Sequence, residues 1–173
     1  MKSWALLATM VLLVFVGVGQ LAFYYDQLPE NVASHFNAQG EADGYMSKST
    51  HMVMMGALLI GTPAFMFLIA WGLRFMPNDL INMPHKEYWL ADERRLESLA
   101  VVATGLYSIS IATQLLLLYI NQLVTWENLG QGGMSGPYPW VALGVYLGYT
   151  IGFCIWLSRR FQLPDDAVLK PTA

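Results

Sequence analysis

Four long stretches without any Asp, Glu, Lys, Arg or His constrain the fold of this 173-residue chain more than any other feature. They cover residues 4–25, 52–73, 98–126 and 138–158. An α-helix needs about 20 apolar residues to cross the hydrocarbon core of a bilayer, and each stretch reaches that length. We therefore predict an all-α four-helix transmembrane bundle in a single integral membrane domain, 1–173, with spans at about 4–25, 52–73, 98–123 and 139–158.

The composition supports this prediction and excludes several functions. Charged residues make up only 12% of the chain, which leaves too little polar surface for a soluble domain. A net charge of -3 without a basic stripe argues against nucleic-acid binding. The spans contain no ionisable group, which disfavours ion-coupled transport and an intramembrane hydrolase. We expect their largest polar residues, Gln20, Gln114 and Asn121, to form interhelical hydrogen bonds, and we expect no cofactor.

The distribution of positive charge predicts the orientation. Lys48 lies between the first two spans, whereas the other eight of the nine basic residues lie on the opposite side of the predicted membrane: Lys2, Arg74, Lys86, Arg94, Arg95, Arg159, Arg160 and Lys170. Loops rich in Lys and Arg stay in the cytoplasm. We therefore predict a multi-pass protein of the cytoplasmic membrane with both termini inside and the loop around Lys48 outside.

That outer loop reads LPENVASHFNAQGEADGYMSK, residues 28–48. Residues 32–37 alternate as an extended strand does, and Gly40 and the Asp43-Gly44 pair are turn signals. We predict a short extracytoplasmic hairpin in which residues 44–48 return against 32–37.

Three side chains of this loop are candidate ligands for a divalent metal, namely His35, Glu41 and Asp43. Imidazole and carboxylate groups suit zinc or manganese, but the loop lacks the spacing of a known metal motif. The structural alternative is that His35 and Asn37 bond turn backbone, while Asp43 pairs with Lys48 or caps Gly44.

Two motifs carry a resemblance to a known family. Residues 28–48 resemble the signature LPxx(V/I)xxHFNxxGxxDGxxSK of a family of uncharacterised bacterial membrane domains, shared with the N-terminal part of SdpI-type toxin-immunity proteins. Residues 81–95, INMPHKEYWLADERR, resemble a second signature, NxPxKxYWxxxERR, of stand-alone members. The resemblance implies a bacterial membrane protein, and it singles out Pro29, His35, Phe36, Asn37, Gly40, Asp43, Gly44, Lys48, Asn82, Pro84, Lys86, Tyr88, Trp89, Arg94 and Arg95.

The second motif lies in the predicted cytoplasmic loop, where Asp92 or Glu93 should open the third long helix. Lys86, Arg94 and Arg95 could form a docking surface for a regulatory partner or anionic lipid. The structural alternative is an interfacial elbow that fixes the angle between two helices. The outer segment GQGGMSGPYP, 130–139, lacks the Lys-Ser/Thr of a P-loop and predicts a flexible connection.

Two small-residue ladders suggest how the last two spans pack. One comprises Gly144, Gly148 and Gly152, and the other Ala100, Thr104, Ser108 and Ala112. Small residues at intervals of four let helix backbones approach closely. We predict an antiparallel pair that meets through these ladders.

Three functions remain open. The leading hypothesis is a non-catalytic sensor or immunity protein, whose outer loop meets an extracytoplasmic peptide or envelope component and whose inner loop contacts a cytoplasmic partner. The first alternative is a metal-dependent membrane-surface enzyme built on His35, Glu41 and Asp43. The second is a structural subunit of a membrane complex.

Overall fold

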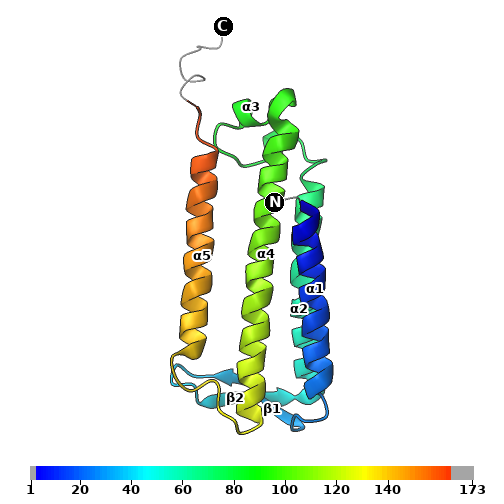
Figure 1. Cartoon of the computed structure of the whole chain (residues 1–173), viewed down its shortest axis with the longest axis vertical. Helices are drawn as coiled ribbons and strands as arrows, with labels where there is room; N and C mark the ends of the chain where they lie inside the picture. The colour runs from blue at the N-terminus through cyan, green and yellow to red at the C-terminus, as the bar shows by residue number, and fades with distance from the viewer. Residues whose placement is uncertain (1–2, 165–173) are drawn as a thin grey trace.

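The computed structural model describes residues 3–164. Its elements are α1 (Ser3–Tyr24), β1 (Asn31–Phe36), β2 (Ala42–Ser47), α2 (Lys48–Gly72), the 3-10 turn η1 (Asn78–Leu80), α3 (Lys86–Trp89), α4 (Asp92–Asn128) and α5 (Tyr138–Arg160). The four long helices stand side by side, with the hairpin of β1 and β2 across one end and η1 and α3 at the other (Figure 1). We call these ends the hairpin end and the elbow end.

The predicted fold class is confirmed. Within residues 3–164, α1, α2, α4 and α5 are the four helices long and apolar enough to cross a membrane. Each predicted span falls on one of them, and α4 begins at Asp92 as expected. The hairpin also forms, with strands at 31–36 and 42–47 against the predicted 32–37 and 44–48. The chain is thus a multi-pass membrane protein that contacts the lipid bilayer.

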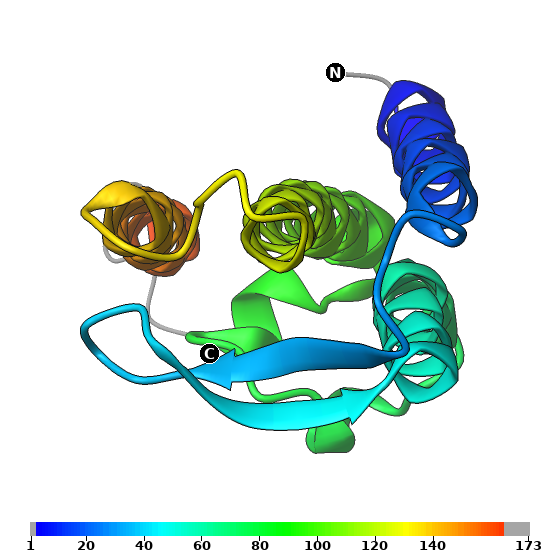
Figure 2. The ribbon, with the colours of Figure 1, turned by 90° about the horizontal axis from the view of Figure 1, so that it is seen from below.

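Helix α4 is the centre of the bundle, because α1, α2 and α5 all pack against it. Seen from below, α1, α2 and α4 form a compact group, and α5 stands on the far side of α4 (Figure 2). The interior of that group holds one apolar cluster of Leu6, Met10, Ala70, Ala103 and Tyr107. At the elbow end a second cluster contains Ile81, Met83, Leu90, Leu99 and Phe161.

The predicted contact between two small-residue ladders is wrong, although α4 and α5 are indeed neighbours. A Cβ added at Gly144, Gly148 or Gly152 would meet no atom within 4 Å, so this ladder faces away from the rest of the chain. Helix α5 instead turns aromatic residues towards α4. Phe153 lies over Gly105, where an added Cβ would be 2.7 Å from the ring.

The need of tyrosine hydroxyl groups for hydrogen-bond partners explains which face of α5 turns towards α4. The Tyr149 hydroxyl bonds the Ser108 hydroxyl, and the Tyr146 hydroxyl lies 3.1 Å from Thr113 Oγ1. A hydroxyl without a partner in hydrocarbon is costly, whereas glycine carries no side-chain group that needs one. The helices therefore place large residues of α5 on small residues of α4.

Candidate functional site

The junction between the hairpin and α2 is fixed by Ser47 and Lys48, the last two residues of the first signature. The Ser47 hydroxyl caps α2 by accepting a 3.2 Å hydrogen bond from the Thr50 amide. Lys48 Nζ lies 2.9 Å from Glu30 Oε1 and donates to the Leu28 carbonyl at 3.4 Å. These contacts hold the beginning of α2 against the segment that precedes β1.

The turn between the strands is organised by Asn37. Its Oδ1 accepts hydrogen bonds from the Gln39 and Glu41 amides, each at 3.0 Å, and its Nδ2 donates to Glu41 Oε2 at 2.9 Å. Gly40 has a φ of 83°, in the left-handed region that glycine adopts without strain. The prediction that Asn37 bonds turn backbone is confirmed, whereas the His35 side chain bonds the Asp43 carboxylate instead.

His35 and Asp43 face each other across the hairpin, with Nδ1 2.5 Å from Oδ1. Of the two roles expected for Asp43, pairing with Lys48 or capping Gly44, the pairing with Lys48 is wrong, because the strand register places Gly44 opposite His35 and Ser47 opposite Asn31. That register leaves Asp43 beside the imidazole and Lys48 beside Glu30. Gly44 is needed at this crossing, since an added Cβ would lie 2.8 Å from His35 Cβ.

Only two of the three candidate metal ligands lie next to each other. Glu41 bonds Asn37, while His35 and Asp43 contact each other and remain largely exposed. Among residues 3–164, no group of three or more His, Cys, Asp or Glu side chains is arranged to hold a metal ion.

Asn128, the last residue of α4, holds β1 in place. Its Oδ1 accepts a 2.7 Å hydrogen bond from the Ala33 amide, and its Nδ2 donates to the Ala33 carbonyl at 2.9 Å. The side-chain amide thus bonds one strand residue as a neighbouring strand would. Sequence reasoning missed Asn128, because nothing local to it shows which distant backbone it meets.

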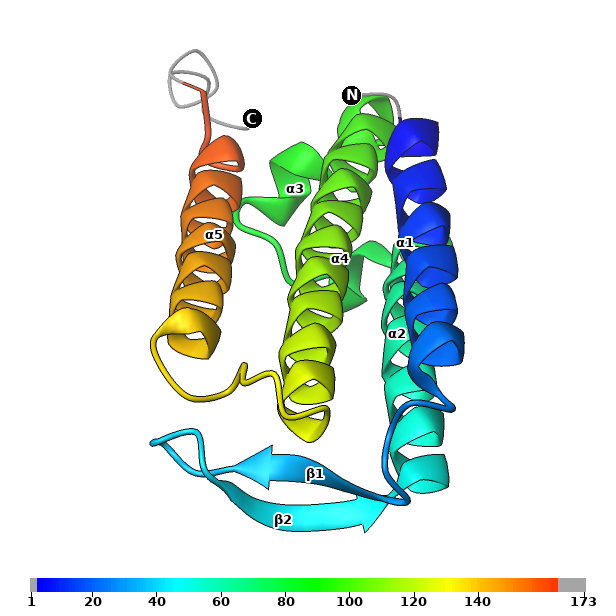
Figure 3. The same ribbon diagram turned by 60° about the horizontal axis from the view of Figure 1, so that its bottom comes forward.

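The hairpin tip rests on the connection between α4 and α5. An added Cβ at Gly40 would lie 2.3 Å from the Met134 carbonyl oxygen, so the two backbones are in close contact. The Met134 amide in turn donates to Glu127 Oε2 at 3.0 Å. The Gly-rich segment that we expected to be a flexible connection is therefore anchored to both α4 and the hairpin, and Figure 3 shows the tip beneath it.

A cavity of about 370 Å³ lies between the hairpin tip, α4 and α5. Its hairpin wall is formed by Phe36, Asn37, Ala38 and Gly40, and its other walls by Leu116, Ile120, Met134, Pro139, Trp140 and Leu143. Three residues of the first signature thus line one hollow. Its size and its apolar, aromatic lining are those of a small ligand pocket. Pro29, another candidate residue from the first signature, is exposed before β1.

A larger apolar groove of about 610 Å³ also runs between α4 and α5. It shares Leu116 with the cavity but includes none of the hairpin residues. The signature residues therefore distinguish the smaller cavity as the candidate site.

Between α1 and α4, near the hairpin end, polar side chains form a continuous hydrogen-bonded network. Asn121 Nδ2 donates to Gln20 Oε1 at 3.0 Å, Gln20 Nε2 to Gln122 Oε1 at 2.8 Å, and Gln122 Nε2 to the Tyr24 hydroxyl at 3.1 Å. Gln114 Nε2 bonds the Met10 carbonyl at 3.2 Å. The predicted interhelical hydrogen bonds are confirmed.

One ionisable side chain, His51, lies just before the second predicted span. Helix α2 begins at Lys48, four residues before the uncharged stretch, so it includes His51 in its first turn. His51 is buried, with a residue exposure of 5%.

At the elbow end, the second motif mainly holds its own backbone. Arg95 donates to the Arg74 and Met76 carbonyls and to Asn78 Oδ1, and Arg94 donates to the Tyr88 carbonyl while its guanidinium lies over the Tyr88 ring. These bonds support the structural elbow. Asn82 and Pro84 are exposed, and Lys86 begins α3.

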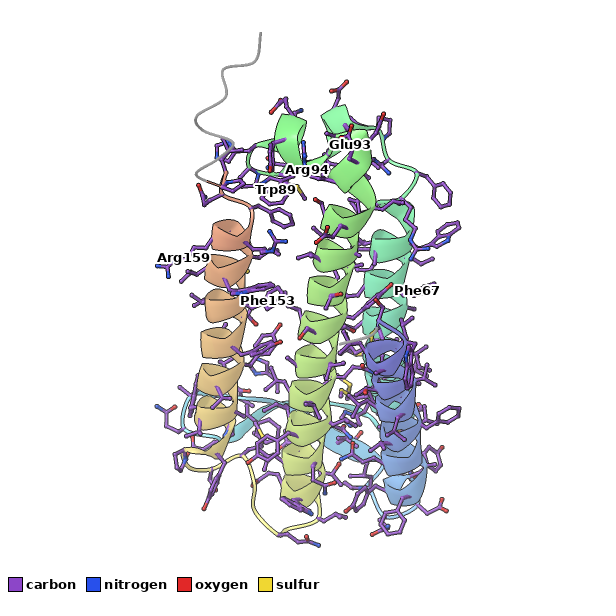
Figure 4. All side chains as sticks on the ribbon, turned by 45° about the horizontal axis from the view of Figure 1, so that its top comes forward. Phe67, Trp89, Glu93, Arg94, Phe153 and Arg159 are labelled. Atoms are coloured by element: carbon purple, nitrogen blue, oxygen red, sulfur yellow. The ribbon has the colours of Figure 1, made fainter. Side chains whose placement is uncertain are left out.

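Trp89 connects the elbow to the end of α5. Its indole N–H donates to the Phe161 carbonyl at 2.9 Å, and the two rings meet edge to face. Figure 4 shows Trp89 and Arg94 gathered at this end, whereas Arg159 points away from the bundle.

Comparison with known proteins finds one family model that matches part of this chain. A family model described as a domain of unknown function (DUF1648) matches residues 12–60. The match spans most of α1, the whole hairpin and the first half of α2. No curated protein and no solved structure matches the chain.

Proposed function

We propose that this membrane protein recognises an extracytoplasmic peptide or envelope component at its hairpin end, as a non-catalytic sensor or immunity protein similar to the N-terminal part of SdpI-type proteins. The observation that carries the proposal is the position of Phe36, Asn37 and Gly40, three signature residues that line one cavity. The Asn37 side chain is occupied by the turn, so the cavity offers mainly apolar contacts.

The cavity lies where a peptide at the membrane surface can reach it. Its hairpin wall lies outside the predicted spans, whereas Leu116, Ile120 and Leu143 belong to them. An apolar side chain of a surface-bound peptide would enter between the tip and Trp140, as anchors enter pockets in other interfaces. Aromatic residues such as Trp140 favour this interfacial depth.

Orientation is the first part of the proposal to test. Arg74, Lys86, Arg94, Arg95, Arg159 and Arg160 lie at the elbow end, while Lys2 and Lys170 lie outside the described residues. The positive-inside rule then assigns the elbow end to the cytoplasm of a bacterial cell and the hairpin end to the outside.

A reporter that is active only in the cytosol, inserted between Gln39 and Gly40, is expected to stay inactive. The same reporter placed after Asn82 in the elbow should be active, which controls for expression. A reporter that is active in the hairpin and inactive in the elbow would show that the membrane orientation is the reverse of the predicted one. The proposed outer recognition site would then be excluded.

Changing the shape of the cavity is expected to weaken recognition. Ala38→Trp places a large ring inside the cavity, and Phe36→Ala removes one of its walls. The measurement is survival of cells that carry each variant as their only copy, during exposure to fractionated secreted peptides, with membrane-inserted protein quantified. Loss of one buried aromatic anchor costs about 2 kcal/mol or more, which predicts roughly a thirtyfold shift in the protective dose.

Leu115→Trp is the matched control for the added ring. Leu115 lines the larger α4–α5 groove and is absent from the cavity, so this variant should protect as the unaltered chain does. Equal protection by Ala38→Trp, Phe36→Ala and Leu115→Trp at equal protein levels would exclude the cavity as the recognition site.

The elbow supplies the proposed inner contact. Arg94 and Arg95 use their guanidinium groups on neighbouring carbonyls, so they shape the surface rather than present free charge. Lys86 and Arg159 are the basic side chains that we assign to contact with a cytoplasmic partner. Arg159 is exposed at the end of α5 and points away from the bundle (Figure 4).

A further inference from the structure

The two edges of the hairpin differ. In an antiparallel ladder, residues alternate between pairs that exchange both backbone hydrogen bonds and pairs whose amide and carbonyl groups point outwards. Ala33 pairs with Tyr45 in register, yet both its amide and its carbonyl bond the Asn128 side chain. Ala33 and Tyr45 therefore form a pair of the outward-pointing kind.

A second contact confirms this alternation. The Lys48 amide donates to the Glu30 carbonyl at 2.9 Å, three positions along the ladder from the Ala33–Tyr45 pair. An odd separation changes the type of pair, so the two observations agree. The Tyr45 amide and carbonyl consequently point away from β1. The amide of Ser47, two residues further along β2, does the same.

Asn128 occupies the outer edge of β1, but nothing in the described part of the chain occupies the corresponding edge of β2. Within residues 3–164, no hydrogen bond beyond the hairpin ladder reaches the Tyr45 backbone. The Tyr45 residue is 65% exposed, and β2 lies on the side of the hairpin away from α4 (Figure 2). An unpaired edge of this kind is a template on which an extended chain can add as a further strand.

The net charge of the hairpin segment selects the partner. Between residues 25 and 48 the chain carries the carboxylates of Asp26, Glu30, Glu41 and Asp43 but only one Lys or Arg, Lys48. Lys48 pairs with Glu30, which leaves Asp26, Glu41 and Asp43 without a Lys or Arg partner in the described part of the chain. An added strand rich in Lys or Arg would meet complementary charge, whereas an acidic strand would be repelled.

We propose that the open edge of β2 binds an extended, basic peptide segment by strand addition, through the Tyr45 and Ser47 backbone. This inference rests on the proposed recognition function, for which it names the class of ligand. The added strand would run along the hairpin, and an apolar residue of the same ligand could reach the cavity at the tip.

Tyr45→Pro provides the sharpest test, because proline removes only the outward amide of Tyr45 and leaves the ladder between β1 and β2 without a missing donor. Tyr45→Val is the matched variant that loses the phenol ring but keeps the amide. Retained amide protection at Val32 shows that the hairpin of each variant is folded.

The probe is a fluorescent six-residue peptide of alternating Lys and Val with blocked ends. Binding is measured by anisotropy on the full chain in phosphatidylcholine nanodiscs, with empty nanodiscs subtracted. Loss of one backbone hydrogen bond predicts about tenfold weaker binding to Tyr45→Pro, and little change for Tyr45→Val. The same peptide with N-methylated backbone amides should also bind weakly, which tests the mechanism without altering the protein.

Several results would overturn the proposal. They are no binding to the unaltered chain above empty nanodiscs, equal binding by Tyr45→Pro, equal binding of the N-methylated peptide, or equal binding of a peptide of alternating Glu and Val. These results are distinguishable from failure of the proposed function, because the survival assay with Ala38→Trp and Phe36→Ala depends on the cavity and not on the β2 edge.

Discussion

Replacing Gly40 with alanine is expected to separate the hairpin tip from the connection between α4 and α5. The added Cβ would lie 2.3 Å from the Met134 carbonyl oxygen and 2.7 Å from Ser135 Cα. Both neighbours are backbone atoms, which cannot rotate aside as the end of a flexible side chain can. The φ of 83° adds about 1–2 kcal/mol for a residue with a Cβ.

Amide hydrogen exchange in nanodiscs measures this separation. We expect exchange to accelerate about tenfold or more in segments 37–41 and 133–136, since each 1.4 kcal/mol corresponds to a factor of ten. The Met134 amide should be affected most, because its hydrogen bond to Glu127 depends on the position of the loop.

Gly132→Ala is the matched control for backbone strain. Gly132 has a φ of 71°, but an added Cβ there would meet no atom within 4 Å. This variant therefore carries the conformational cost without the collision. If Gly40→Ala and Gly132→Ala changed exchange equally at the hairpin tip, the contact between Gly40 and Met134 would not hold the tip in place.

The spans and the hairpin could be predicted from the sequence because the physical signals that specify them are local. A charged side chain within hydrocarbon is so unfavourable that its absence over about 20 residues marks a span. The turn is equally local, since Asn37 bonds the amides of Gln39 and Glu41 within the same few residues.

Errors arose where partners depend on strand register or helix rotation. Asp43 and Lys48 are five residues apart, yet the ladder sends one to His35 and the other to Glu30. The register follows once the turn is centred between Asn37 and Glu41, where the Asn37 side chain bonds the turn. The burial of His51 in the first turn of α2 also depends on helix rotation and was not predicted.

The face of α5 could not be read from a ladder of small residues alone. Gly144, Gly148 and Gly152 permit a close approach, but they do not require one. Tyr146 and Tyr149 do require partners for their hydroxyls, and Thr113 and Ser108 on α4 supply them. In a membrane helix, the residues that need hydrogen bonds are therefore a stronger guide to the buried face than residues that merely leave room.

The candidate site could be predicted only in part, because its walls come from segments that are far apart in the sequence. The signature residues Phe36, Asn37 and Gly40 could be singled out, but their common cavity could not, because its other walls come from α4 and α5 more than 70 residues later. Asn128 and Glu127 are long-range anchors of the same kind. No local pattern distinguishes them from other polar residues at the end of a helix.

Replacing Asn128 with alanine is expected to release β1 from the bundle. Ala33 is only 7% exposed, and its amide and carbonyl would both lose their partner. Each buried backbone group without a hydrogen bond costs about 1–3 kcal/mol, so we expect a local cost of about 2–4 kcal/mol. Amide exchange in segment 31–36 should accelerate about a hundredfold, while the helix content seen by circular dichroism remains unchanged.

Asn128→Asp separates the two bonds that the side chain makes to β1. A carboxylate still accepts from the Ala33 amide, but it has no donor for the Ala33 carbonyl and repels it. We expect an intermediate acceleration in this variant and none in Gln131→Ala, an exposed position at the same end of the bundle. Unchanged exchange of segment 31–36 in Asn128→Ala would mean that β1 is held by its apolar contacts alone, with Val32 fully buried beneath it. The graded series therefore tests whether one side-chain amide fixes the signature hairpin over the helices.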